Sequence, residues 1–286
     1  MDVGLRKDTE DEDMALTVNT NVPSLSAQRH LATSSLSLGR SFERLSSGLR
    51  INSASDDAAG LAIADKLRFD VRVASQAIRN ANDGISAISV GEKALGKVGD
   101  IVARLAELAE QSSSGLVSNS QRSALQQEFT ALVSEIDRIS NTTTFNGVSL
   151  LSSGTTVNLQ VGLDGTTNSR ISFSTVDGSS SGIGLNTVAV SSQDAAQSAI
   201  TSITSAVETV ASRRGTLGAV ESRLNTAISN LRVARENFAS AESRIRDTDV
   251  AEETANLTRA TILQQAGVSV LAQANQQPQL ALSLLR

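Results

Sequence analysis

Residues 67–102 have the sequence LRFDVRVASQAIRNANDGISAISVGEKALGKVGDIV, in which apolar side chains recur in alternating steps of four and three. With lapses at Glu92 and Gly99, the series comprises Leu67, Val71, Ala74, Ile78, Ala81, Ile85, Ile88, Glu92, Leu95, Gly99 and Val102. This spacing is typical of a helix that buries one stripe against a partner helix. It predicts a helix over residues 58–113, about 84 Å long at 1.5 Å per residue.

Two further stripes have the same spacing. The shorter comprises Leu125, Phe129, Leu132, Ile136 and Ile139. The longer comprises Ile200, Ile203, Val207, Val210, Arg214, Leu217, Glu221, Leu224, Ile228, Leu231, Arg235, Phe238, Glu242 and Ile245. Its polar members predict that the apolar stripe drifts around the helix. Three such helices can bury one another's stripes, which predicts a bundle.

The two ends of the chain carry thinner stripes. One comprises Leu31, Ser35, Leu38, Phe42, Leu45 and Leu49, and the other Val250, Thr254, Leu257, Thr261, Gln264, Val268 and Leu271. A pair of such helices buries little apolar area and would be marginally stable alone. We therefore expect these ends to associate with copies of the chain. The residues predicted to form this assembly stripe are Leu31, Leu38, Phe42, Leu45, Leu257, Val268 and Leu271.

Residues 152–192 differ from the rest because they are rich in Ser, Thr and Gly. Apolar residues alternate with polar ones at Val157, Leu159 and Val161, and again at Ile171 and Phe173. Asp-Gly pairs at 164–165 and 177–178 are turn signals, so the segment predicts a β-hairpin with loops. The predicted fold is mainly α: a long antiparallel helical bundle or coiled coil with a small β-hairpin region and paired N- and C-terminal helices.

The stripes also suggest a division into domains. Residues 1–14 form an acidic extension that we expect to be disordered, because residues 1–13 hold six acids and two bases. Residues 15–57 and 248–286 form an inner terminal coiled-coil domain. Residues 58–247 form an outer helical bundle that includes the hairpin.

Composition limits the function. Among 286 residues there is no Cys, Trp or Tyr, one His, and a formal net charge of −5. A thiolate metal site is therefore excluded, an imidazole cluster cannot form, and an electrostatic grip on nucleic acid is not expected. We predict no catalytic residue, metal or cofactor, and hence no enzyme. No run of 18 or more apolar residues and no leader of the Sec type is present, so neither membrane insertion nor a cleaved signal is expected.

Several short motifs look like functional sites but have simpler interpretations. Residues 91–98 match the phosphate-binding loop motif except at the last position, where Val98 replaces the Ser or Thr that would bind Mg²⁺. Ser55 or Asp56 would cap the long helix. His30 has no obvious acidic partner. The amides at 264–265 and 275–277 are expected to hydrogen-bond across a helix interface.

Residues 45–64, LSSGLRINSASDDAAGLAIA, resemble the N-terminal signature of bacterial flagellin, as do residues 80–85, NANDGI. Residues 145–148, FNGV, resemble the family's turn after its third helix. Residues 262–275, ILQQAGVSVLAQAN, and the terminal LSLLR are similar to its C-terminal signature. The resemblance covers about 15–151 and 200–286 and indicates a short form without large outer domains.

This resemblance implies a structural subunit that assembles into the helical, extracellular flagellar filament, a propeller for motility. The terminal helices would line the channel as an inner coiled coil. The resemblance also implies export without a cleaved signal through the flagellar type III apparatus, with an export chaperone, cap and hook-junction proteins as partners.

Flagellins also have a surface recognised by a Toll-like innate receptor. The resemblance places it at Arg104, Leu108, Gln111 and Glu128. Ala106 and Glu110 depart from the family's pattern, which places a usual Arg and a usual apolar residue there.

Two alternatives to a filament subunit stay open at this point. A hook–filament junction protein shares parts of the same signatures. A helical-bundle signalling or adaptor module would share the long stripes but would leave residues 152–192 unexplained.

Overall fold

The computed structural model describes residues 20–152 and 154–284. Its contacts divide the chain into two compact units, Met1–Asp65 with Ala241–Arg286, and Lys66–Ser240. We call them the terminal unit and the bundle unit. The predicted acidic extension, residues 1–14, lies outside the described residues. The predicted functional domains, with boundaries at 57/58 and 247/248, stay a prediction.

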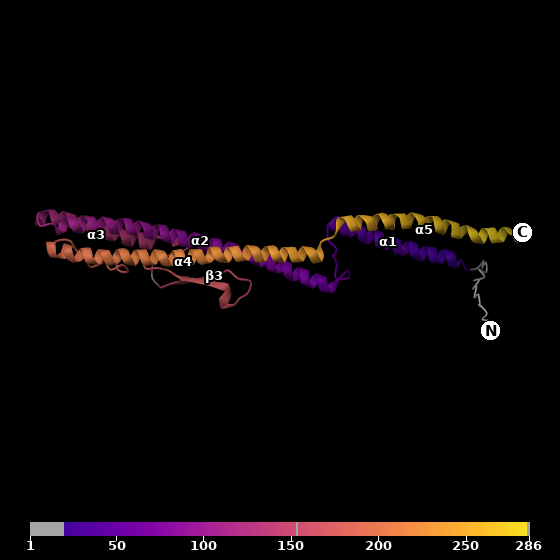
Figure 1. The fold of residues 1–286 in the computed structure, drawn as a ribbon, viewed down its shortest axis with the longest axis horizontal. Helices are drawn as coiled ribbons and strands as arrows, with labels where there is room; N and C mark the ends of the chain where they lie inside the picture. Colours follow the sequence, from indigo (N-terminus) through magenta and orange to yellow (C-terminus); the bar gives the residue numbers. More distant parts are fainter. Residues whose placement is uncertain (1–19, 153, 285–286) are drawn as a thin grey trace, which may run out of the picture. The chain divides into compact units, whose positions relative to one another are not determined.

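Two helices make up most of the terminal unit, α1 (Val22–Ser47) and α5 (Val250–Leu284), and Figure 1 shows them side by side. The Asn21 side chain caps α1 by accepting a hydrogen bond from the Ser24 backbone N–H at 3.1 Å. Gly48 ends α1 with a φ of 72°, a left-handed conformation that glycine adopts without strain. The paired terminal helices of the predicted fold are confirmed.

In the same unit, the segment at residues 48–50 is hydrogen-bonded to the segment at residues 246–248. The Arg50 N–H donates to the Arg246 carbonyl at 2.6 Å, and the Thr248 N–H donates to the Gly48 carbonyl at 3.0 Å. The carboxylate of Asp57 then accepts from the Gly60 N–H at 2.8 Å, at the start of α2 (Ala58–Ser113). Asp57 is therefore the helix cap, and the prediction of Ser55 or Asp56 is wrong by one or two residues.

In the bundle unit, α2 packs with α3 (Asn119–Thr142) and α4 (Gln193–Arg246). The bounds of α2 agree with the predicted helix over 58–113. Buried positions of α2 follow alternating steps of three and four: Ala74, Ala77, Ala81, Gly84, Ile88, Gly91, Leu95, Val98, Val102, Leu105, Ala109 and Ser112. A continuous buried stripe of this kind is what holds a long helix in a bundle.

Two β-hairpins lie between α3 and α4. The predicted one pairs β3 (Thr156–Gln160) with β4 (Arg170–Ser174), with a short 3-10 turn, η1 (Thr167–Ser169), before β4. A smaller one pairs β1 (Thr144–Phe145) with β2 (Val148–Ser149); the resemblance implied its turn at 145–148, but its strands were not predicted. Its two central residues, Asn146 and Gly147, have φ values of 48° and 80°, as a two-residue turn of type I′ requires.

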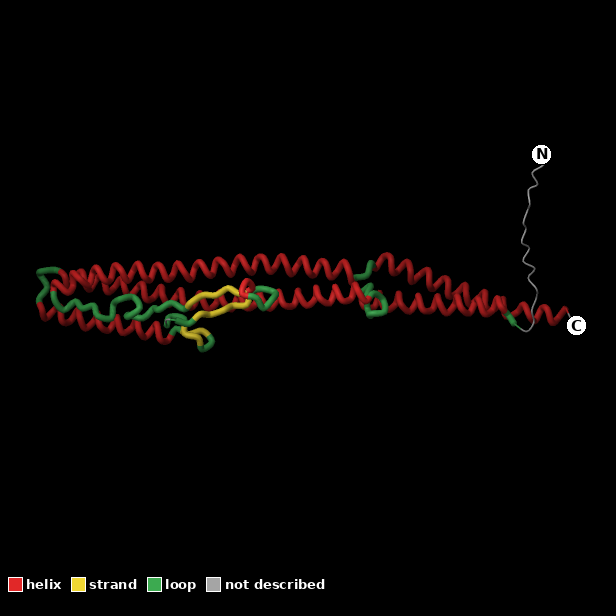
Figure 2. Tube along the Cα trace, turned by 90° about the horizontal axis from the view of Figure 1, so that it is seen from below, coloured by secondary structure: helices red, strands yellow, loops and turns green. Residues whose placement is uncertain are grey.

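The larger hairpin packs against the helices. Ile171 and Phe173 share one buried cluster with Ile88 and Leu95 of α2 and with Leu217, Leu224 and Ile228 of α4. The following segment, 175–192, runs along the helices, as Figure 2 shows, and buries Ile183, Leu185 and Val190 in a second cluster around Phe129. The Ser- and Thr-rich middle of the chain is therefore part of the core.

Gly84 allows the hairpin to approach α2 closely. A Cβ atom at this position would lie 2.3 Å from Leu159 Cδ1 and 3.3 Å from Leu224 Cδ1. A residue without a side chain thus leaves room for Leu159 of β3.

A buried arginine closes the turn between α2 and α3. The Arg122 guanidinium donates to the carbonyl oxygens of Ser112 and Ser114, both at 2.9 Å, and to Asn119 Oδ1 at 3.2 Å. These carbonyls belong to the end of α2 and the residue just after it, where backbone acceptors lack helical partners. A positive charge there also suits the negative end of the helix dipole.

Candidate interaction surfaces

The contact between α1 and α5 follows one seam, which we call the pairing seam. Its residues are buried or half-buried and recur in steps of three and four. They are Ser24, Ala27, Leu31, Ser34, Leu38, Ser41 and Leu45 in α1, and Glu253, Leu257, Ala260, Gln264, Gly267, Leu271 and Ala274 in α5. Half of the members are Ser, Ala or Gly. Such small side chains bury little apolar area, so the seam gives the pair modest stability.

Polar groups fix how the two helices align. The Asn21 amide donates to the Ala274 carbonyl, and the Ser24 hydroxyl donates to Asn275 Oδ1, both at 2.8 Å. At the other end of the antiparallel pair, Arg44 Nη1 lies 3.6 Å from Glu253 Oε2. The Gln264 amide donates to Ser35 Oγ at 3.4 Å, so the predicted role of Gln264 and Asn275 in cross-helix hydrogen bonding is confirmed. Buried Glu253 was not predicted.

Large apolar side chains of the pair point away from the seam. Each of the following is more than half exposed: Val22, Leu25, Leu36, Phe42, Val250, Ile262, Leu263, Val268 and Val270. Of the predicted assembly stripe, Phe42 and Val268 are in this exposed group, whereas Leu31, Leu38, Leu45, Leu257 and Leu271 are half-buried in the pairing seam. Soluble monomers rarely gather so many exposed apolar residues without an interaction partner.

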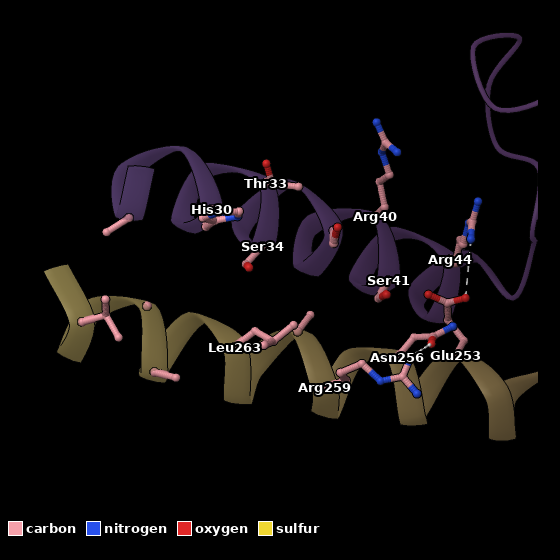
Figure 3. Close-up of a pocket in the computed structure, with 16 residues that line it drawn as sticks. His30, Thr33, Ser34, Arg40, Ser41, Arg44, Glu253, Asn256, Arg259 and Leu263 are labelled. Atoms are coloured by element: carbon pink, nitrogen blue, oxygen red, sulfur yellow. Dashed lines mark hydrogen bonds and ion pairs between the residues drawn. The ribbon is translucent and has the colours of Figure 1, made fainter. Parts of the chain in front are cut away.

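A groove of about 740 Å³ runs along one side of the α1·α5 pair. Figure 3 shows its labelled residues. Its floor is made of small residues, Ala27, Ser34, Ser41, Ala260 and Gly267. Charged residues also line it: Arg40, Arg44 and Arg259 against a single acid, Glu253. We call this feature the basic groove.

Of the four residues predicted to form the receptor surface in the bundle unit, three are exposed and one is buried. Arg104 joins α2 to α3, because its Nε and Nη2 donate to Glu128 Oε1 at 3.1 and 2.9 Å. Its Nη1 also donates to Glu107 Oε2 at 2.6 Å, and these two acids raise the pKa of Arg104. Gln111 is exposed. Leu108 is only 1% exposed, because it packs in the core around Phe129, so its prediction as a surface residue is wrong.

The motif at 91–98 has no phosphate-binding geometry. All eight residues lie inside α2, where the backbone N–H groups are used by the helix, and Val98 is fully buried. His30 is exposed at the edge of the basic groove. Within residues 20–152 and 154–284, no group of three or more His, Cys, Asp or Glu side chains is placed to hold a metal ion.

Asp56 holds a loop rather than a substrate. Its carboxylate accepts from the Ser53 N–H and the Ser53 hydroxyl, both at 3.0 Å, and from the Asn52 N–H at 3.2 Å. These hydrogen bonds favour the charged form and lower the pKa of Asp56, the Ser53 N–H contributing most.

In the described part of the chain, no helix combines the length and apolarity needed to cross a bilayer.

Comparison with known proteins supports a single family. Residues 18–156 match the model of the bacterial flagellin N-terminal helical region, and residues 200–285 match that of the C-terminal helical region. A flagellin of Halalkalibacterium halodurans is 45% identical over 270 residues, covering 94% of this chain and 99% of that protein. The flagellar filament 33 kDa core protein of Treponema phagedenis is 37% identical over 284 residues, again covering 94% and 99%.

Longer relatives also match. Polar flagellin F of Vibrio parahaemolyticus is 34% identical over an alignment of 376 positions that covers 95% of this chain and all of that protein. This alignment is longer than the 286 residues of the chain, so the Vibrio protein contains additional sequence. Among solved structures, the crystal structure of Bacillus cereus flagellin matches 54% of this chain and 88% of that one, with 25% identity and a TM-score of 0.49.

The helical fold and these matches identify a structural subunit of a bacterial flagellar filament. Both terminal helical regions are present, and the relatives are matched over almost their whole length. The chain belongs to the bacterial flagellin family.

Proposed function

We propose that copies of this flagellin pack against one another through the side of the α1·α5 pair that carries Phe42 and Val268. The observation that supports this proposal is the exposure of large apolar side chains on a pair whose own seam is rich in small residues. Burying such side chains against a second copy supplies the apolar area that the pairing seam lacks. A head-to-tail contact that does not close on itself produces a fibre.

The experiment compares three chains by sedimentation and electron microscopy after salt-induced assembly. Phe42→Ala with Val268→Ala should raise the critical concentration at least tenfold, because each truncation removes about 1–2 kcal/mol of apolar burial. Val233→Ala is the matched control, since Val233 of α4 is 59% exposed but lies in the bundle unit. If the double variant and the control assembled equally well, this contact would be ruled out.

We further propose an extracellular location in the filament, with export through the flagellar type III apparatus and without a cleaved signal. An export chaperone would cover α5 before assembly, because its exposed residues Ile262, Val268 and Val270 would otherwise associate early. Cap and hook-junction proteins would meet the same helices at the filament ends. Co-purification of the intact chain with these proteins, lost on truncation of α5, would support this proposal.

Recognition by a Toll-like receptor is proposed only for the exposed part of the predicted surface. This part consists of Arg104, Gln111 and Glu128, with Glu110 beside them. Because Arg104 is already engaged by two acids of its own chain, a receptor must compete for it. A reporter-cell assay with Arg104→Ala tests the proposal, and a response that is unchanged from the natural chain would contradict it.

We propose no enzymatic role, since the relatives that match are structural flagellins. The comparisons give no support to a hook–filament junction protein or to a signalling or adaptor module.

A further inference from the structure

One edge of the β3·β4 hairpin, in the bundle unit, is open to pairing. The Val161 N–H donates to the Ser169 carbonyl at 2.9 Å, so these two opposite residues form a hydrogen-bonded pair. Hydrogen-bonded and non-hydrogen-bonded pairs alternate along an antiparallel ladder. The backbone N–H and C=O groups of Arg170, Ser172 and Ser174 in β4 therefore point away from β3, and all three residues are exposed.

Most of these outward groups have no partner. The Arg170 N–H donates to the Thr167 carbonyl in the preceding turn. The Arg170 carbonyl and the N–H and C=O groups of Ser172 and Ser174 form no hydrogen bond with residues 20–152 or 154–284. We call these unpaired groups the free edge. A row of unpaired backbone groups of this kind is a template for a further strand.

The chain itself pairs with the same side of the hairpin just beyond β4. The Val176 N–H donates to the Leu150 carbonyl at 3.3 Å. Two residues further on, the Gly178 N–H donates to the Leu151 carbonyl at 2.9 Å. An extended segment can therefore approach this side of the hairpin, and among the described residues the chain supplies one only beyond β4.

The free edge is fixed in place and unprotected. Natural proteins protect such edges with proline, lysine or a bulge, and the sequence of β4, Arg-Ile-Ser-Phe-Ser, pairs with β3 in continuous register and contains none of these. Ile171 and Phe173 are buried against α2 and α4 and hold the strand, whereas Ser172 and Ser174 have short side chains. A partner strand would therefore meet an edge that is already ordered, which lowers the entropic cost of binding.

Arg170 gives the free edge a preference for negative charge. Its Nε donates to Gln160 Oε1 at 3.0 Å and its Nη2 donates to the Gly165 carbonyl at 3.3 Å, both of which are neutral groups. The carboxylate of Asp164 accepts instead from the Thr166 hydroxyl at 2.8 Å. In the described part of the chain, Arg170 has no ion-pair partner. A carboxylate on an added strand would supply one.

We propose that the free edge binds an extended segment of another protein that carries an acidic residue opposite Arg170. The segment adds to β4 as an antiparallel third strand and exchanges two hydrogen bonds with Ser172. Main-chain hydrogen bonds supply the affinity of such strand addition, and the charge-assisted contact with the guanidinium supplies the preference.

A second copy of this chain is a less complementary partner for the free edge. If β4 paired with β4 of a second copy about Ser172, Arg170 would lie opposite Ser174 of that copy. No carboxylate would then reach the guanidinium. The charge of Arg170 thus favours a foreign acidic strand over self-pairing.

A labelled peptide tests the proposal on the full-length, unassembled chain at low salt. The probe is fluorescein-Thr-Thr-Val-Thr-Val-Glu-Thr-amide, whose central Thr aligns with Ser172 and whose Glu aligns with Arg170. Fluorescence anisotropy measures its Kd, and backbone amide NMR locates it. We expect saturable binding with shifts of the Ser172 and Ser174 amides.

Two altered peptides separate the contributions of the backbone and of the charge. N-methylation of the central Thr removes its donor to the Ser172 carbonyl and should raise the Kd about tenfold. Replacing Glu by Lys should also raise the Kd about tenfold at low salt. This second difference should shrink in 1 M NaCl, where the Debye length falls to about 3 Å.

A pair of proline variants tests the edge in the chain. Ser172→Pro removes an outward N–H and leaves the ladder with β3 intact, as an edge proline does. Asn158→Pro, directly opposite, does the same on the other edge, and both variants lose the 2.7 Å hydrogen bond between the two side chains. Ser172→Pro should raise the Kd about tenfold, whereas Asn158→Pro should leave it unchanged. Circular dichroism verifies that both keep their helices.

Three results would overturn the proposal. They are the absence of saturable binding to the natural chain, equal affinity for the N-methylated and unmodified peptides, and equal affinity of the two proline variants. Shifts of the Ser172 and Ser174 amides that depend on protein concentration without peptide would also overturn it, since they would assign the edge to a second copy. The Phe42→Ala, Val268→Ala variant should bind the peptide normally, so this test is independent of filament assembly.

Discussion

Arg214 of α4 donates two hydrogen bonds, from Nε at 3.0 Å and from Nη2 at 2.6 Å, to Oε1 of Glu92 in α2. Each residue interrupts the apolar stripe that the sequence predicts for its own helix. The two polar residues contact each other across the interface between α2 and α4, so their positions in the two stripes correspond. One charge pair of this kind favours one alignment of two long helices over a slide by one heptad.

Reversing one charge of this pair should destabilise the bundle unit modestly. Arg214→Glu should lower the free energy of unfolding by about 1 kcal/mol, because the pair is partly exposed and then becomes repulsive. Adding Glu92→Arg to it should recover most of the loss. Urea denaturation measures both, and the absence of any recovery in the swapped variant would argue against a pairwise interaction.

Gly84 should tolerate alanine but not valine. Gly84→Ala gains up to about 1 kcal/mol of helix propensity, which offsets the displacement of the flexible end of Leu159. Gly84→Val should cost about 1–3 kcal/mol, because its branches meet both Leu159 and Leu224. Gly96→Val is the control, since no atom lies within 4 Å of a Cβ built at Gly96 of the same helix. Thermal unfolding that gave the same shift for both valine variants would refute the close-approach explanation.

Loss of the buried guanidinium of Arg122 should be costly. Arg122→Ala removes the donors to Ser112 and Ser114 and should lower the free energy of unfolding by about 2–4 kcal/mol. Arg122→Lys should recover only part, since an ammonium cannot reproduce the planar fork of donors. Arg223→Ala, at an exposed site of α4, should change stability by less than about 0.5 kcal/mol. Equal effects of Arg122→Ala and Arg223→Ala would contradict this role.

The loop held by Asp56 should be sensitive to acid. Because the folded pKa of Asp56 is lowered, its contribution to stability is present above the unfolded pKa of about 4 and is lost as the pH falls through the folded value. Carbon-13 NMR titration of the carboxyl group should show a midpoint below that of a model peptide. In Asp56→Asn, the protection of the Ser53 amide, taken relative to its intrinsic exchange rate, should no longer fall on acidification over this range. A persisting loss of protection would implicate another group.

The sequence was sufficient to predict the long helices and the larger hairpin. In α1, α2, α4 and α5, however, alternate members of the predicted stripe lie one residue after the position that the structure buries or half-buries. In α2 the prediction shares Ala74, Ala81, Ile88 and Leu95 with the structure. Between them it has Ile78 and Ile85, whereas the structure buries Ala77 and Gly84 and leaves the isoleucines half-buried. Hydrophobicity alone favours the isoleucine at each of these positions. Close packing of the helices and the approach of Leu159 instead place the smaller neighbouring residue, Ala77 or Gly84, in the buried position.

The same displacement explains two other errors. In α4, burial continues in steps of three and four at Ala199, Ile203, Ala206 and Val210, so the predicted drift of the stripe is wrong. In α1, Ser34 is half-buried and Ser41 is buried, whereas the predicted Ser35 and Phe42 are exposed. Runs of Ser, Ala and Gly at heptad spacing were the available signal for the pairing seam. The basic groove could not be predicted, since it depends on how α1 and α5 are aligned.

The α1·α5 pair combines segments that are about 200 residues apart in the sequence. A polypeptide released early from the ribosome would possess Phe42 but lack Val268 and the whole second half of the seam. The contact proposed for Phe42 and Val268 would therefore need a finished chain, and incomplete translation products would lack one half of it.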